Sequence, residues 1–169
     1  SSDIRGPEVN FASRELVSLT AMLVIAENFY RGEKPWDLAR IAAHINLPPR
    51  LAQDILGHLT RLGFLSEVRD GKGGGPAYQP GCALDTLTVH GLLQGLKADG
   101  ARYTRLRKTP ERELVRAIEE TMDAAGREAL EGLTLRTLVG RLQERRGEGT
   151  VQLSEENSAR ENSPSAKTA

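Results

Sequence analysis

The chain has 169 residues, with 23 Lys and Arg against 23 Asp and Glu, so its formal net charge is zero. This length fits one domain with a core of its own, and the single cysteine, Cys82, can neither form an internal disulfide nor ligate zinc alone. The balanced charge excludes a polybasic protein that holds nucleic acid by bulk electrostatics. Aromatic residues are only 4% of the chain, which favours a helical domain over a β-sandwich.

A first helix is predicted over residues 11–30, where apolar side chains recur at the three- and four-residue steps of a helix face. Gly32 ends this helix, and Pro35 prevents its continuation. The expected apolar stripe consists of Leu16, Leu19, Leu23, Ala26, and Phe29 or Tyr30.

Two short helices joined by a tight turn are predicted next. Asp37 caps the first, and the second begins at Pro49, because proline is tolerated in a first helical turn. Gly63 lies one position past the second helix, where glycine most easily adopts a left-handed cap. The apolar faces are Leu38, Ile41, Ala42 and Ile45 on the first helix, and Leu51, Ile55, Leu59 and Leu62 on the second. This pattern predicts a helix-turn-helix.

A glycine-rich hairpin follows the helix-turn-helix. Residues 64–68 and 77–79 are predicted strands around the loop 69–76. The loop lacks the GxxxxGK[ST] spacing of a phosphate-binding loop, and behind a helix-turn-helix such a hairpin is a wing. The predicted fold class is therefore mostly α: a winged helix-turn-helix with a small β-hairpin wing, followed by a long helix and a short C-terminal helix.

Three parts are expected along the chain. Residues 1–97 form the winged helix-turn-helix, whose last helix, Val89 to Lys97, has Thr88 as its cap. Residues 98–146 hold a basic connector, a long helix from Pro110 to about Glu131 and a short helix from Leu133 to Leu142. Residues 147–169 carry too little apolar surface to offset their ordering entropy, so a disordered tail is predicted there.

The side chains that could act in catalysis or bind a metal give little support to an enzymatic function. His44, His58 and His90 have no paired metal-ligand spacing, and the GxSxG and HExxH motifs are absent from the sequence. His44 and His58 are interpreted as exposed or helix-terminal histidines, and Cys82 as a bystander thiol. No catalytic residue, metal site or cofactor is therefore predicted, and a nuclease is the weakest of the alternatives.

DNA binding has better candidates, on the second helix of the motif and on the wing. Arg50 has the chemistry to read guanine and Gln53 to read adenine, while basic side chains further along meet phosphates. The candidate contact residues are Pro49, Arg50, Gln53, Arg61, Arg69 and Lys72. Against them, residues 1–97 carry balanced charge, and Asp54 and Asp70 lie on the faces that would meet phosphate. Nucleic acid is thus a candidate partner that the charge does not favour.

Two further surfaces are candidates for partners. A dense basic patch, Arg102, Arg105, Arg107 and Lys108, has the charge to contact nucleic acid or anionic lipid, and a solvated connector explains it equally well. The long helix 110–131 has an apolar stripe, Leu114, Ile118, Met122, Ala125 and Ala129. Packing on the first helix and pairing with a second copy or another protein both remain open.

The runs ENFYRGEKPWDLARIAAHINLPPRLAQDILGHLTRLGFLSEV, AYQP, LDTLTVHGLLQGLK and ALEGLTLRTLV make residues 6–142 similar to the cytoplasmic C-terminal extension of the YihY/BrkB inner-membrane proteins, once labelled ribonuclease BN. The opening Gly6-Pro7-Glu8-Val9 resembles the end of that family's last membrane helix, with Pro7 departing from the pattern. The resemblance implies a non-catalytic regulatory or interaction domain on the cytoplasmic face of a bacterial inner membrane, attached through a segment preceding this chain.

The architecture also resembles the IscR/NsrR-type winged-helix transcription regulators, which share the wing, the short helix after it and a long dimerisation helix. Those proteins hold an iron–sulfur cluster on three cysteines, whereas the interval Val89 to Pro110 has none here. Their glycine-rich wing tip is partly matched by residues 71–74, before Pro76-Ala77 interrupts it. This resemblance implies a cluster-free DNA-binding transcription regulator as the alternative function.

Overall fold

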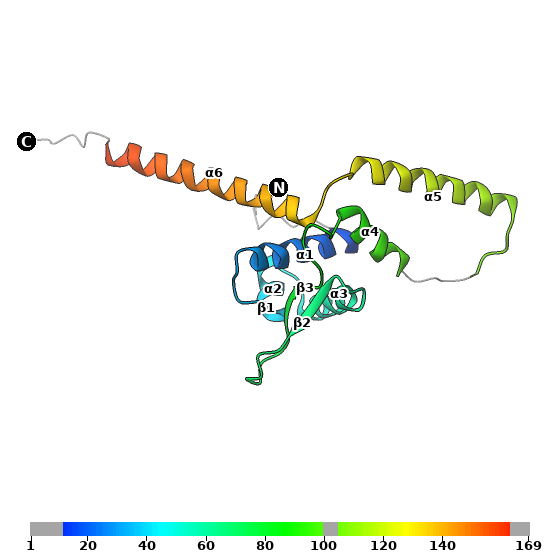
Figure 1. Cartoon of the computed structure of the whole chain (residues 1–169), viewed down its shortest axis with the longest axis horizontal. Coiled ribbons are helices and arrows are strands. Elements are labelled where there is room, and N and C mark those ends of the chain that lie inside the picture. The colour runs from blue at the N-terminus through cyan, green and yellow to red at the C-terminus, as the bar shows by residue number, and fades with distance from the viewer. Residues whose placement is uncertain (1–11, 100–104, 163–169) are drawn as a thin grey trace, which may run out of the picture.

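The computed structural model describes residues 12–99 and 105–162 (Figure 1). Its first part consists of α1 (Arg14–Tyr30), β1 (Trp36–Asp37), α2 (Leu38–Ile45), α3 (Pro49–Arg61), β2 (Leu65–Val68) and β3 (Ala77–Pro80). The helices α4 (Val89–Ala98), α5 (Pro110–Ala129) and α6 (Leu135–Glu161) follow. The predicted winged helix-turn-helix is confirmed: α2 and α3 are the helix pair, and the β2–β3 hairpin is the wing.

The three strands form one antiparallel sheet in the order β1-β3-β2. The two-residue β1, which the sequence analysis did not predict, pairs Trp36 with Tyr78 and Asp37 with Ala77. It directly precedes α2, where the side chain of Asp37 accepts a hydrogen bond from the backbone N–H of Arg40. The wing is therefore attached to the beginning of the helix-turn-helix as well as to its end.

Local signals set the helix ends, as the sequence predicts for Thr88 and Gly63. The side chains of Ser13, Thr88, Thr109 and Thr134 each accept a hydrogen bond from a backbone N–H in the first turn of the helix they precede. Gly63, after α3, has φ of +83°, the left-handed conformation that glycine adopts without steric cost. These caps satisfy backbone groups that have no partner within the helix.

The hydrophobic core lies where α1, α2, α3, the sheet, α4 and the start of α6 meet. Its buried side chains include Met22, Ile25, Ile41, Ile55, Leu56, Leu59, Leu65, Tyr78, Leu92, Leu135 and Val139. The predicted stripe on the first helix was wrong in part, because Leu16, Phe29 and Tyr30 are exposed and the buried face carries Ser18, Ala21, Met22, Ile25 and Ala26. This helix is apolar around much of its circumference, so periodicity alone does not select its buried side.

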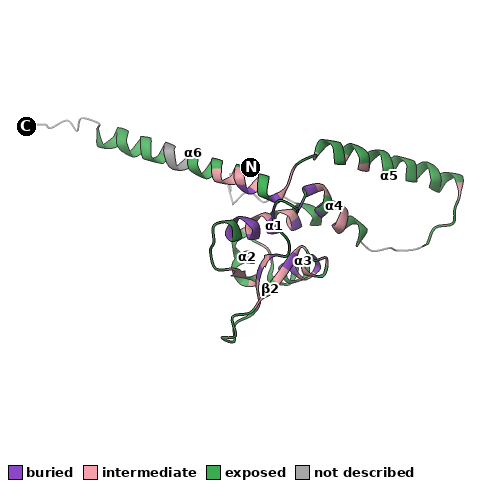
Figure 2. Cartoon of the chain, viewed as in Figure 1, coloured by how far each residue is buried: buried purple, intermediate pink, exposed green. Residues whose placement is uncertain are grey.

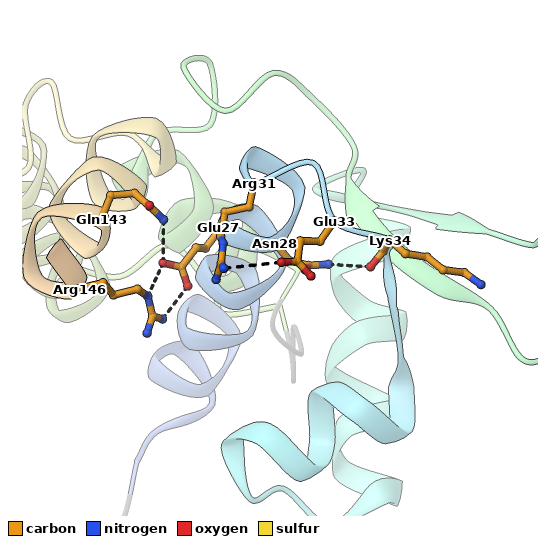
Figure 3. A network of polar contacts seen from close by, with 7 residues as sticks. All are labelled: Glu27, Asn28, Arg31, Glu33, Lys34, Gln143 and Arg146. Atoms are coloured by element: carbon orange, nitrogen blue, oxygen red, sulfur yellow. Dashed lines mark hydrogen bonds and ion pairs between the residues drawn. The ribbon is translucent and has the colours of Figure 1, made fainter. Parts of the chain in front are cut away.

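The N-terminal part of α6 is built into this core. Its start is fixed by backbone hydrogen bonds from Leu135 to Leu87 and from Arg136 to Leu84, beside a β-bridge between Thr88 and Thr134. Two to three turns further along, α6 lies against α1, where Arg146 and Gln143 donate hydrogen bonds to the buried carboxylate of Glu27 (Figure 3). Segments more than a hundred residues apart are thus held together by one acidic side chain.

Two predictions for the C-terminal part differ from the structure. The short helix expected over residues 133–142 is the beginning of the 27-residue α6, which runs through Glu161 and so includes most of the predicted tail. This stretch is rich in Glu, Gln, Arg and Leu, which favour helix, and a helix that has already begun adds each further residue at little cost. Residues 163–169 of the predicted tail lie outside the described residues.

The helix α5 lies on the side opposite to the far half of α6 (Figure 1), and its Asp123 contacts His90 and Gln94 of α4. None of its residues is buried, so the helix is coloured as exposed along almost its whole length (Figure 2). Its apolar side chains Leu114, Val115, Ile118 and Met122 are between 56% and 70% exposed. Of the two packing arrangements left open by the sequence, packing on α1 is therefore not the one observed.

Candidate nucleic-acid interface

One side of α3 faces outward, away from the core. Positions 50, 53, 54, 57 and 61 recur at three- and four-residue steps, so they share one face of the helix. We call Arg50, Gln53, Asp54, Gly57 and Arg61 the outer face of α3. The opposite side of the helix buries Ala52, Ile55, Leu56 and Leu59, which fixes the orientation of this face. The side chains of Arg50, Gln53, Asp54 and Arg61 are all exposed.

The acidic member of the outer face has a basic partner from another helix. Nη1 of Arg14, in the first turn of α1, donates a hydrogen bond to Oδ2 of Asp54 at 2.6 Å. This hydrogen bond and the charge of Arg14 lower the pKa of Asp54, so its carboxyl group stays ionised. The negative charge that argued against phosphate binding is therefore balanced within the interface, by a residue 40 positions away in the sequence.

Arg14 also connects the outer face to the end of α4. Its Nη2 lies 3.4 Å from Nδ1 of His58, and Nε2 of the same ring lies 2.5 Å from Oδ2 of Asp99, which follows α4. His58 lies in the last turn of α3, so it is a helix-terminal histidine as predicted, but it is only 7% exposed, whereas His44 is exposed. The ring is buried because it lies between α1 and α4, an arrangement that the sequence of α3 does not reveal.

The wing carries its predicted basic residues on the surface. Arg69 and Lys72 are both exposed, and the backbone N–H of Lys72 donates to the side chain of Asp70, which shapes the turn. Asp70 also lies 3.8 Å from Nζ of Lys34, which precedes β1. Like Asp54, Asp70 weakened the DNA interpretation, and it too faces a basic side chain far away in the sequence.

A cavity of about 350 Å³ opens at the base of the wing, between the loop after β2 and the start of α2. Trp36 lines it together with Arg40, whose guanidinium lies 4.4 Å above the indole ring. Lys34, Asp70, Gly74 and Gly75 complete much of the lining. Lys34 and Arg40 do not stand out in the sequence, because only the pairing of β1 with β3 brings them beside the wing.

The structure describes three of the four residues of the predicted basic patch. Arg102 lies outside the described residues, while Arg105, Arg107 and Lys108 are exposed on the segment leading into α5. The guanidinium of Arg112 donates a hydrogen bond to the backbone carbonyl of Leu106, which anchors this segment to the first turn of α5. The described residues of the patch therefore belong to the segment that leads into α5, and none of them is on α3.

The described residues also bear on metal, thiol and membrane sites. Within residues 12–99 and 105–162, no three His, Cys, Asp or Glu side chains gather where they would hold a metal ion. The thiol of Cys82 is exposed and lies 3.6 Å from the carbonyl oxygen of Gly63. None of the described helices combines the length and apolarity needed to cross a lipid bilayer.

Comparison with known proteins bears on the fold. The chain matches no protein-family model and no curated protein sequence, so the resemblance to YihY/BrkB proteins gains no support. Its structure is similar to CymR, the global cysteine regulator of B. subtilis, with 22% identity and a TM-score of 0.56 over 79% of this chain and 98% of CymR. T. potens IscR has 17% identity and a TM-score of 0.57, over 81% of this chain and 90% of IscR.

Staphylococcus aureus CymR is similar to the same extent, with 21% identity and a TM-score of 0.54 over 76% of this chain and 96% of that one. The likeness spans nearly the whole length of each of these proteins, and it supports the second resemblance, to IscR-type regulators, better than the first. The chain therefore has the mostly helical winged-helix fold of regulators such as CymR and IscR.

Proposed function

We propose that this protein binds duplex DNA and regulates transcription, with α3 in the major groove and the wing on the sugar-phosphate backbone. The observation that carries the proposal is the outer face of α3, which presents Arg50, Gln53 and Arg61 to solvent on a helix that the core holds rigidly. A second helix held this way in a winged helix is the element that enters the major groove.

Each side chain has a role that follows from its chemistry. Arg50 offers two donors to the O6 and N7 atoms of guanine, and the amide of Gln53 pairs with N6 and N7 of adenine. Arg61 lies two turns beyond Gln53 on α3, and Arg69 and Lys72 lie on the wing. These three side chains contact phosphates, and such contacts position the protein without reading the base sequence. The pairing of Asp54 with Arg14, and of Asp70 with Lys34, balances the charge of these two acidic side chains.

The proposed DNA-binding unit is a dimer formed through α5. The exposed side chains along this helix, including Leu114, Ile118 and Met122, form a continuous apolar stripe, whereas apolar side chains on a protein surface are usually scattered singly. Pairing with a second copy buries the stripe on both chains at once, because a two-fold interface uses the same surface twice. Two copies of α3 then meet two half-sites of one DNA duplex.

A mobility-shift assay with mixed genomic DNA at low salt tests the proposal. We expect a shift that weakens steeply as salt rises, because bound phosphates release counterions. The double variant Arg50→Ala/Arg61→Ala should lose the shift. The matched control is Arg141→Ala/Arg145→Ala, which removes two exposed arginines from α6 and should bind as the wild type does. Absence of any shift for the wild type at low salt would refute DNA binding.

A further inference from the structure

The middle of the outer face of α3 is a glycine whose presence the fold does not explain. Gly57 lies inside a helix, where glycine is less favourable than alanine, and its φ is not in the left-handed region. A Cβ at this position would meet only the Nη1 atom of Arg61, at 3.4 Å, which is the mobile end of a flexible side chain. Neither packing nor backbone conformation therefore requires glycine here.

A glycine on a binding face allows another molecule to approach the backbone closely. The side chain next to it on this face is Asp54, at i−3, which is short and 57% exposed. Arg14 donates to its Oδ2, and among the described residues nothing donates to its Oδ1. The structure thus holds one carboxylate oxygen in place and leaves the other as a free acceptor beside the glycine.

We propose that Asp54 is a specificity-determining residue that accepts a hydrogen bond from the N4 amino group of cytosine in the major groove. Asp and Glu are the side chains that accept from this group, and cytosine presents it there as a donor. Because the aspartate side chain is short, it reaches a base edge only where the helix lies close to the floor of the groove, and the missing side chain of Gly57 permits this approach. Arg14 offsets the carboxylate charge against the surrounding phosphates.

The inference rests on the proposed DNA binding, and the test separates the two. Duplexes with a randomised core are selected on the wild-type chain, which should show a strong cytosine preference at one position of each half-site. In the Asp54→Asn variant, adenine should be preferred over cytosine at that position by roughly tenfold, because an asparagine amide pairs with N6 and N7 of adenine. Asp85→Asn, the same change on an exposed loop, should leave the profile unchanged.

Gly57→Ala tests the close approach with two readouts of opposite sign. Helix propensity predicts a higher Tm for this variant, whereas the proposal predicts that affinity for the selected duplex falls about tenfold or more. Gly140→Ala is a closely matched control, because a Cβ there would also meet only an arginine Nη1 atom, at 3.6 Å from Arg136. It should raise the Tm and leave DNA affinity as it is.

The outcomes distinguish a failure of the proposed DNA binding from a failure of the inference about Asp54 and Gly57. If the wild type selects no sequence and binds no DNA at low salt, the proposed function fails and this inference fails with it. If the wild type binds DNA but Asp54→Asn keeps the wild-type base profile, or Gly57→Ala keeps wild-type affinity, the inference alone is overturned. A thermal melt of each variant verifies that a loss of binding is not a loss of folding.

Discussion

At the scale of single residues, the carboxylate of Glu27 connects α1 to α6. It is 7% exposed and accepts hydrogen bonds from Nε and Nη2 of Arg146 at 2.7 and 2.6 Å, as well as one from Gln143 (Figure 3). The hydrogen bonds from Arg146 lower the pKa of Glu27, against the effect of burial. We expect Glu27→Gln to reduce the free energy of unfolding by about 1–3 kcal/mol in urea denaturation at pH 7.

The pH dependence of this effect has a defined sign. Because the folded-state pKa of Glu27 lies below its ordinary value of 4.5, its contribution is complete above that pH and is lost as pH falls through the folded pKa. The stability difference between wild type and Glu27→Gln should therefore shrink below about pH 4.5. Glu33→Gln, in an exposed pair with Arg31, should change stability by less than about 0.5 kcal/mol. A difference that grows in acid would contradict this account.

Gly95 shows the opposite case to Gly57. A Cβ at Gly95 would lie 2.6 Å from the ring of Phe64, so α4 can pack against this ring only without a side chain there. We expect Gly95→Ala to lower the free energy of unfolding by about 1–3 kcal/mol, in spite of the helix propensity of alanine. Thermal melts of both glycine variants measure this contrast. A Tm for Gly95→Ala at or above that of the wild type would show that Phe64 yields without cost.

At the scale of elements, α5 carries the proposal for self-association. Ile118→Asp places a charge in the middle of its exposed apolar stripe, so pairing would have to bury that charge. We expect the dimer dissociation constant to rise by at least about tenfold in sedimentation equilibrium, with an unchanged Tm for the monomer because the side chain is already 59% exposed. Ala117→Asp, which adds the same charge off the stripe, should remain dimeric. A wild type that is monomeric at high concentration would exclude this interface.

At the scale of the whole molecule, α6 has two halves with different roles. Leu135 and Val139 are fully buried, whereas the side chains of residues 153–162 are exposed (Figure 2). Truncation after Glu148 should therefore leave the Tm within about 2 °C of the wild type, while truncation after Thr134 removes two core side chains worth about 1.5–3 kcal/mol each and should prevent cooperative folding. Hydrogen exchange should be fast beyond residue 152, where no packing protects the amides.

Elements whose signals are local were predictable from the sequence. The helix-turn-helix follows from its Asp37 cap, its Pro49 start and its Gly63 end, and the structure places each of them as predicted. Contacts between distant residues were not predictable. Arg14 and Asp54 are 40 residues apart, and Glu27 and Arg146 are 119 apart. Nothing in the sequence near either partner indicates the other, because such pairs exist only after the helices have packed.

The sequence by itself determined that this protein is a winged helix with equal numbers of basic and acidic residues, since caps, periodicity and composition are properties of the chain. Only the tertiary structure decided what that balance means for binding. It places Arg14 on Asp54 and Lys34 beside Asp70, and it leaves Arg50 and Arg61 exposed on the outer face of α3. A charge total does not show where charges lie, whereas the field that a phosphate meets depends on the distances between them.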